Sequence, residues 1–154
     1  MAALKVGDKA PDFKVVDQEG KAISLDDFKG SKLILYFYPK DDTPGCTAEA
    51  CNLKDNYQVL KTKGFKVLGV SADSEASHKK FIEKYVLPFA LIPDKEKTIL
   101  RAYGAWGMKK MYGREYEGII RTTYVIDEKG VIEKVFTKVD TKNHSQQILD
   151  EMGL

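Results

Sequence analysis

The sequence has few of the residues that hold metals or form covalent crosslinks, since its 154 residues include only two cysteines and two histidines. The disulfide frameworks of small secreted domains need several cysteine pairs, so that class is excluded. A zinc site needs three or four ligands, and His78 and His144 lie far apart in the sequence with no partner at ligand spacing. We therefore expect no metal centre, and we expect both histidines to be solvated or to cap helices.

Long apolar runs and an excess of one charge are also missing. The longest strongly apolar run covers residues 33–38, whereas a membrane helix needs about 20 such residues. The first residues contain no apolar stretch of signal-peptide length. The 25 basic residues nearly balance the 23 acidic ones, so no general field attracts nucleic acid or an anionic membrane. These absences predict a cytoplasmic protein that binds neither nucleic acid nor membrane, with cysteines kept reduced except for transient pairing.

The sequence does contain a regular alternation of strand and helix patterns, which we interpret as one domain over residues 1–154. Residues 17–20 form a turn signal between two short β-rich runs and predict an N-terminal hairpin. The apolar run 33–38 is typical of a buried central strand. The other predicted elements are, in chain order, helix 47–63, strand 66–71, helix 74–85, strand 89–92, helix 95–103, surface loop 106–118, strand 121–126, strand 131–139 and helix 143–152.

This order of elements predicts the fold class. The early strand–helix–strand alternation implies parallel strands joined by crossover helices, and the late pair of strands adds an antiparallel edge. We therefore expect an α/β protein with a thioredoxin-like fold, in which helices flank a central mixed sheet.

Cys46 stands at the first turn of a predicted helix, directly after a strand and a loop. The unpaired N–H groups and the dipole at a helix N-terminus favour an anion. A thiol at this place loses its proton more easily, and the thiolate is the reactive form. A free cysteine is more often a small buried hydrophobic residue, but a helix N-terminus after a buried strand is where ligands approach open α/β sheets. The position therefore favours a chemical role.

Cys51 follows five residues later in the same predicted helix. On an ideal helix this spacing gives a Cα separation of about 8.6 Å, whereas a disulfide needs less than about 7 Å. The two cysteines can therefore bond only if the first turns of the helix unwind. The spacing is not the C-x-x-C of dithiol oxidoreductases, and no histidine is positioned for a Cys–His hydrolase.

The segment PKDDTPGCTAEAC, residues 39–51, closely resembles peroxiredoxins of the PrxQ type, also called the bacterioferritin comigratory protein group. Their signature, Pro-x-x-x-Thr-x-x-Cys, is matched by Pro39, Thr43 and Cys46, and Cys51 matches the resolving cysteine of one branch. The resemblance covers nearly the whole chain, through the segments GDKAPDF, LILYFYPKDDTPGC, KVLGVSAD and WGMKKMYGREYEGIIRTTYVID.

The resemblance implies a role for each matched residue. Cys46 corresponds to the peroxidatic cysteine, Cys51 to the resolving cysteine, Thr43 and Arg121 to polar partners of the reacting sulfur, and Pro39 to its shield. An arginine is always protonated and can favour a thiolate while it holds the peroxide. A threonine hydroxyl can place the peroxide in line for attack.

Glu49 lies one turn beyond Cys46, where a carboxylate facing the sulfur would oppose thiolate formation. We expect it instead to orient Arg121 or another basic group.

The implied activity is a thiol-dependent peroxidase of the atypical 2-Cys kind, which requires no metal, haem or flavin. Cys46 would reduce hydrogen peroxide or an organic hydroperoxide and become a sulfenic acid, and Cys51 would condense with it to a disulfide. Thioredoxin or a glutaredoxin-like dithiol would then reduce that disulfide. Two alternatives remain at this stage, a thiol–disulfide oxidoreductase and a redox-sensing binding protein. We expect a monomer, because no extended C-terminal arm is evident.

Overall fold

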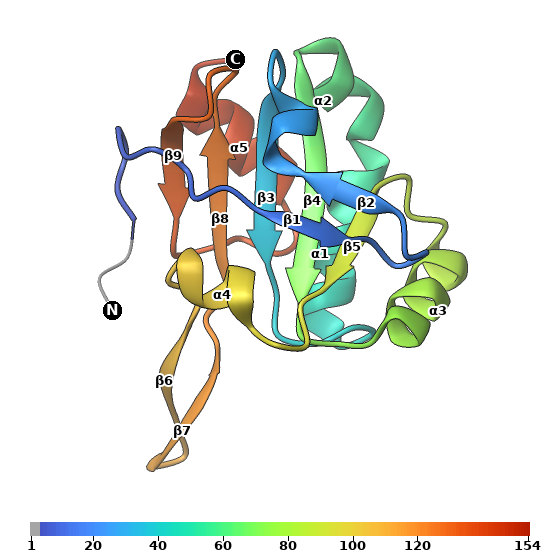
Figure 1. Ribbon diagram of the computed structural model, residues 1–154, viewed down its shortest axis with the longest axis vertical. Coiled ribbons are helices and arrows are strands. Elements are labelled where there is room, and N and C mark those ends of the chain that lie inside the picture. Colours follow the sequence, from blue (N-terminus) through green and yellow to red (C-terminus); the bar gives the residue numbers. More distant parts are fainter. Residues whose placement is uncertain (1–3) are drawn as a thin grey trace.

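The computed structural model describes residues 4–154, so the first three residues of the predicted domain lie outside the described part (Figure 1). Its elements are, in chain order, β1 (Lys14–Val16), β2 (Ala22–Ser24), the 3-10 helix η1 (Leu25–Phe28), β3 (Lys32–Phe37), α1 (Pro44–Asp55), α2 (Tyr57–Thr62), β4 (Phe65–Ser71), α3 (Glu75–Tyr85), β5 (Ala90–Pro93), α4 (Thr98–Ala102), β6 (Trp106–Met111), β7 (Arg114–Ile119), β8 (Thr122–Ile126), β9 (Ile132–Phe136) and α5 (His144–Met152).

Five of the strands form the central sheet, in the order β5-β4-β3-β8-β9. Strands β3, β4 and β5 are parallel, whereas β8 is antiparallel to both β3 and β9. Strands β1 and β2 form a separate antiparallel hairpin near the N-terminus. The predicted mixed sheet and N-terminal hairpin are therefore confirmed. The apolar run predicted as the strand 33–38 is the central strand β3, whose bounds are Lys32–Phe37.

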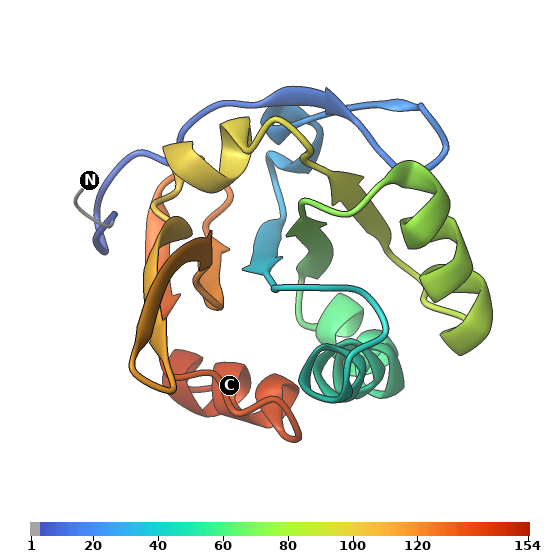
Figure 2. The ribbon, with the colours of Figure 1, turned by 90° about the horizontal axis from the view of Figure 1, so that it is seen from below.

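The alternation of side chains along β3 divides the core into two layers. Leu33, Leu35 and Phe37 pack on the face covered by the β1–β2 hairpin and α4. Ile34 and Tyr36 pack on the opposite face, in the cluster to which α1, α2, α3 and α5 contribute. Figure 2 looks along the sheet and shows α1 and α5 together on one side, with the hairpin and α4 on the other. None of the helices in residues 4–154 is long and apolar enough to cross a membrane.

The prediction of one continuous helix over residues 47–63 is wrong, because the chain forms two helices, α1 and α2, separated at Asn56. The Asn56 side-chain amide donates to the Asn52 carbonyl over 2.9 Å. A short polar side chain that bonds to the local backbone competes with the regular helical ladder. The helix also begins earlier than predicted, since Pro44 occupies its first turn.

The helix predicted over residues 95–103 is shorter than expected and begins at Thr98. The Asp94 carboxylate accepts the N–H groups of Thr98 and Leu100, at 3.0 and 2.8 Å. Lys97 adopts a left-handed conformation with φ of 61°, so the chain before it cannot continue the helix. Strands β8 and β9 are likewise shorter than predicted, and Arg121 lies one residue before β8.

The segment 106–118, predicted as a surface loop, is instead the antiparallel hairpin β6–β7. Tyr112 and Gly113 join its strands with φ values of 52° and 76°, the conformation of a tight primed turn. The hairpin extends from the body of the molecule beyond α4 (Figure 1). The first four residues of β7, 114–117, are all exposed, on both faces of the hairpin. A strand with neither face buried needs no alternation of apolar and polar residues, so the sequence carries no strand signal here.

Candidate active site

Cys46 lies where the sequence predicted, in the first turn of a helix that follows the central strand. The chain leaves β3, turns through residues 38–43 and enters α1 at Pro44, with Thr43 as the extended residue that caps the helix. The Thr47 N–H donates to the Thr43 carbonyl over 2.8 Å and closes the first turn. Cys46 is 1% exposed. Its sulfur is therefore a buried group beside the positive end of the helix dipole.

Arg121 joins this site from the opposite end of the sequence. Strand β8 pairs with β3, with Thr122 opposite Phe37, and this pairing places Arg121 beside the turn that leads to α1. Its Nη2 donates to Cys46 Sγ over 3.3 Å, and its Nη1 donates to Glu49 Oε1 over 2.6 Å. One guanidinium thus links the sulfur of Cys46 to the carboxylate of Glu49.

Glu49 is fully buried one turn after Cys46 and faces Arg121. Burial raises the pKa of Glu49 to about 7, although the neighbouring Arg121 charge acts in the opposite direction. Burial opposes the charged form of Arg121, but the charges of Glu49 and Cys46 outweigh it and raise the arginine pKa above its ordinary value. Within residues 4–154, Glu49 Oε2 has no hydrogen-bond partner.

His144, expected to be solvated or capping, is instead fully buried beside Glu49. Its Nε2 lies 2.9 Å from the Thr123 hydroxyl and 3.7 Å from Glu49 Oε2. Its Nδ1 lies 2.9 Å from Gln147 Oε1. Burial lowers the pKa of His144 to about 4, so the ring is neutral near pH 7. The sequence reasoning missed this residue because Glu49 and Thr123 reach it only through the packing of α1 and β8 against α5.

Gly45 and Tyr36 also belong to the site and were not predicted. A Cβ atom on Gly45 would lie 3.3 Å from Arg121 Nη2, so the glycine lets the guanidinium lie close against the start of α1. The hydroxyl of Tyr36 is buried without a hydrogen-bond partner in the described part of the chain. Burial raises the pKa of Tyr36, and the charges of Glu49 and Cys46 raise it further. The glycine had a sequence signal, since it stands between Pro44 and Cys46.

Thr43 and Pro39 lie in the turn that carries the chain from β3 to α1. The Thr43 hydroxyl donates to the Lys40 carbonyl over 2.8 Å, so in this state it is oriented by the turn. Pro39 is half-buried and directly follows Tyr38, the buried residue after the end of β3. The structure therefore brings both residues to the predicted region, next to the helix that carries Cys46.

Cys51 lies on the same continuous helix as Cys46, and both side chains are free thiols. Cys51 is half-buried. The helix is intact from Pro44 to Asp55, as the spacing argument assumed. This conformation holds the two cysteines apart, so a bond between them requires α1 to change.

The other histidine, His78, is also fully buried rather than solvated. Its Nδ1 lies 2.7 Å from Asp41 Oδ2, and its Nε2 lies 3.0 Å from the Ile92 carbonyl. Among the described residues, Asp41, Asp73 and His78 are a group that brings three possible metal ligands within 4.8 Å of one another. Both ring nitrogens of His78 are used in hydrogen bonds, and Asp73 Oδ2 accepts the Asp41 N–H and the Ser71 hydroxyl. We interpret the group as an internal hydrogen-bond network that holds the β3–α1 turn.

Known proteins are similar in sequence to this chain along nearly its whole length. The profile of the AhpC/TSA family matches residues 6–135. A Bcp peroxiredoxin from Coxiella burnetii is 48% identical over 150 residues, covering 97% of this chain and 99% of the relative. Peroxiredoxin Bcp from Escherichia coli is 43% identical, covering 97% and 96%.

A solved structure shows the same fold. It is the bacterioferritin comigratory protein of Xanthomonas campestris, described for its alkyl peroxide reduction activity, in a trapped intermediate or ligand complex. The two chains superpose with a TM-score of 0.85 and share 32% identity, covering 92% of this chain and 89% of the other. These similarities confirm the thioredoxin-like α/β fold and the resemblance found in the sequence. The chain belongs to the AhpC/TSA family and is a peroxiredoxin of the Bcp or PrxQ type, a thiol peroxidase that acts on hydroperoxides.

Proposed function

We propose that Cys46 is the peroxidatic cysteine and Cys51 the resolving cysteine of an atypical 2-Cys cycle. The observation that carries the proposal is the 3.3 Å contact from Arg121 Nη2 to the Cys46 sulfur at the N-terminus of α1. A thiol that is buried beside a fixed cation and a helix N-terminus has the environment of a reactive cysteine rather than of a packing residue.

In the first step the Cys46 thiolate attacks one oxygen of the hydroperoxide. A sulfur–oxygen bond forms, the oxygen–oxygen bond breaks, and the other oxygen leaves with the bonding electrons and takes up a proton. The products are the Cys46 sulfenic acid and water or an alcohol. Arg121 stabilises the negative charge that moves from sulfur to the leaving oxygen, while Glu49 fixes the orientation of the guanidinium through the 2.6 Å contact.

Thr43 and Pro39 shape the approach of the peroxide in this proposal. The Thr43 hydroxyl can accept a hydrogen bond from the peroxide while it donates to Lys40, because an hydroxyl has two lone pairs. Pro39 has no N–H group and offers water no donor at the wall of the site.

In the second step the Cys51 thiol displaces the sulfenic hydroxyl of Cys46, which forms the disulfide and releases water. A protein dithiol, thioredoxin or a glutaredoxin-like protein, then reduces that disulfide by exchange. We propose that hydrogen peroxide and organic hydroperoxides are both substrates, and the alkyl peroxide reduction described for the Xanthomonas relative supports the organic class. We also propose that the protein is cytoplasmic, because that compartment keeps dithiol proteins reduced. In this proposal it acts as a monomer, and residues 1–154 form one domain.

The test compares wild type with Cys46→Ser and Cys51→Ser, using reduced thioredoxin as the donor and mass spectrometry of each product. Cys46→Ser should show no peroxide-dependent turnover. Cys51→Ser should consume about one equivalent of peroxide and then stop as a sulfenic or more oxidised acid. Retention of most activity by Cys46→Ser would contradict the assignment of the peroxidatic residue, and normal turnover by Cys51→Ser would contradict that of the resolving residue.

A further inference from the structure

A cavity lies at the end of the sheet opposite to Cys46. It has a volume of about 470 Å³ and lies beside the start of β4. Strands β3 and β4 are parallel, with Lys32 opposite Phe65, so this cavity is beside their first residues, whereas Cys46 follows the last residues of β3. Six residues of strand separate the two ends by about 20 Å. The cavity is therefore separate from the peroxide site.

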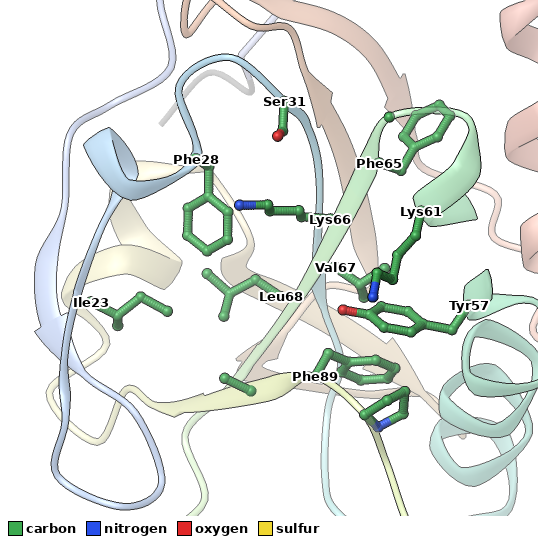
Figure 3. Close-up of a pocket in the computed structure, with 13 residues that line it drawn as sticks. Ile23, Phe28, Ser31, Tyr57, Lys61, Phe65, Lys66, Val67, Leu68 and Phe89 are labelled. Carbon is green, nitrogen blue, oxygen red and sulfur yellow. The ribbon is translucent and has the colours of Figure 1, made fainter. Parts of the chain in front are cut away.

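Aromatic and aliphatic side chains from several elements form the walls of this cavity (Figure 3). Phe28 of η1 stands on one side, Tyr57 of α2 and Phe89 stand on the other, and Leu68 lies between them. The rings of Tyr57 and Phe89 are 6.1 Å apart, so they form a continuous apolar wall. A volume in this range and an apolar lining are typical of small-molecule sites.

Two ammonium groups lie over the aromatic walls. Lys61 Nζ is 5.6 Å from the centre of the Tyr57 ring, and Lys66 Nζ is 5.9 Å from the centre of the Phe28 ring. Figure 3 shows the two side chains on either side of the hollow. Across the described part of the chain, neither lysine takes part in an ion pair, although six other lysines and arginines do so: Lys29, Lys32, Lys54, Lys84, Lys95 and Arg121. The cavity thus combines an apolar interior with two positive charges that have no acidic partner.

The start of β4 also borders the cavity. Strand β5 begins opposite Leu68, so Phe65 and Val67 have no strand opposite them on that edge. The Val70 carbonyl bonds towards β3, and alternate residues of a parallel strand direct their N–H groups to opposite sides. The N–H and C=O groups of Phe65 and Val67 therefore point to the side of β4 that β5 leaves largely uncovered. This free edge is shorter than the five or six residues of a typical strand, so a small ligand fits it better than an added strand.

We propose that this cavity is a binding site for a small amphipathic carboxylate, whose apolar body lies between Phe28 and Phe89 and whose carboxylate pairs with Lys61 and Lys66. The carboxylate of the ligand would be the acidic partner that neither lysine has within the described part of the chain. Because the site is remote from Cys46, its ligand is not the peroxide being reduced.

The test uses decanoate and the uncharged 1-decanol as probes of the full chain, with calorimetry for affinity and heteronuclear NMR for location. Decanoate should bind at least about tenfold more tightly than 1-decanol, since hydrogen bonds to charged groups are the stronger ones. Its chemical-shift changes should gather at Phe28, Tyr57 and Phe89. Equal affinity for the two probes, or shift changes gathered around Cys46, would overturn the proposal.

Three variants and one control variant locate the interaction. Lys61→Gln and Lys66→Gln should each weaken decanoate binding several-fold and leave 1-decanol binding unchanged, whereas the exposed Lys79→Gln on α3 is the matched control and should bind like wild type. Ala90→Leu fills the cavity and should weaken both probes. All four variants should keep wild-type peroxidase turnover, which shows that they fold. If Lys79→Gln lost as much decanoate affinity as Lys66→Gln, or if Ala90→Leu bound both probes normally, the assigned site would be wrong.

Discussion

Closure of the proposed Cys46–Cys51 disulfide should unwind the first turns of α1. The helix is continuous from Pro44 to Asp55 in the reduced state. An ideal helix holds residues five apart at a Cα separation of about 8.6 Å, beyond the limit of about 7 Å for a disulfide. The backbone between the two cysteines must therefore give up its helical hydrogen bonds before the sulfurs can meet.

The cost can be estimated from the contacts that α1 makes. Roughly five backbone hydrogen bonds lie between Thr43 and Cys51, and at about 1 kcal/mol net for each bond the loss is about 5 kcal/mol. The Glu49–Arg121 contact of 2.6 Å is lost as well when the carboxylate leaves its buried place. This cost is comparable to the whole stability of an ordinary domain, about 5–15 kcal/mol. The unwinding must therefore remain local.

Asn52 is the residue that should limit the unwinding. Its side-chain oxygen accepts the Ser145 N–H over 2.7 Å, and its side-chain nitrogen donates to the Lys142 carbonyl over 3.0 Å. Its own carbonyl accepts the Ser145 hydroxyl over 3.2 Å. These contacts attach the middle of α1 to the beginning of α5, and Leu53 is fully buried next to them. We expect the helix to persist from Asn52 onwards.

Hydrogen exchange with mass spectrometry on the reduced and disulfide forms tests this reasoning. Amides 47–51 should exchange up to about 10³-fold faster in the disulfide form, as a local opening cost of several kcal/mol disappears. Amides of β4 should not change. Cys51→Ser treated with the same peroxide cannot form the bond and should keep the protection of α1. Equal protection of amides 47–51 in both forms, with the bond confirmed by mass, would refute the geometric argument.

Three further predictions concern Arg121, Glu49 and the glycine that lies beside the guanidinium. Arg121→Met should slow single-turnover peroxide reduction by about 10²–10³-fold, and Arg121→Lys should recover only part of the rate because an ammonium lacks the two-pronged geometry; an unchanged rate would place Arg121 outside the site. The pKa of Glu49 is about 7 in the folded protein, above its ordinary value of 4.5. The free energy of unfolding is therefore highest below about pH 4.5 and falls by about 3 kcal/mol as the pH rises through 7. Urea unfolding of Glu49→Gln should lack that loss, and identical pH profiles of variant and wild type would contradict it. Gly45→Ala should slow peroxide attack several-fold with little change in thermal midpoint, because its Cβ would lie 3.3 Å from Arg121 Nη2; a wild-type rate would show that the guanidinium can move freely.

Local sequence patterns were sufficient for much of the fold. The apolar run at β3, the turn residues of the N-terminal hairpin and the Ser74 cap of α3 each act over a few residues, and each predicted element is present. The β6–β7 hairpin was missed because it stands away from the core, so neither of its faces needs to be apolar. The break at Asn56 was missed because it depends on one side chain bonding to the backbone rather than on periodicity.

The sequence by itself determined that a thiol stands at the start of a helix, that a second thiol lies out of its reach on the same helix, and that an arginine accompanies them in a known family. Only the tertiary structure decided that Arg121 contacts Cys46 across 75 residues of chain, that His144 is buried beside Glu49, and that Phe28 and Phe89 line one cavity together with Lys61 and Lys66. The physical reason is that helix ends and apolar periods are set by neighbours along the chain. The charges and cavities of a site depend on which strands pair and which helix faces pack, and those contacts join residues that are distant in sequence.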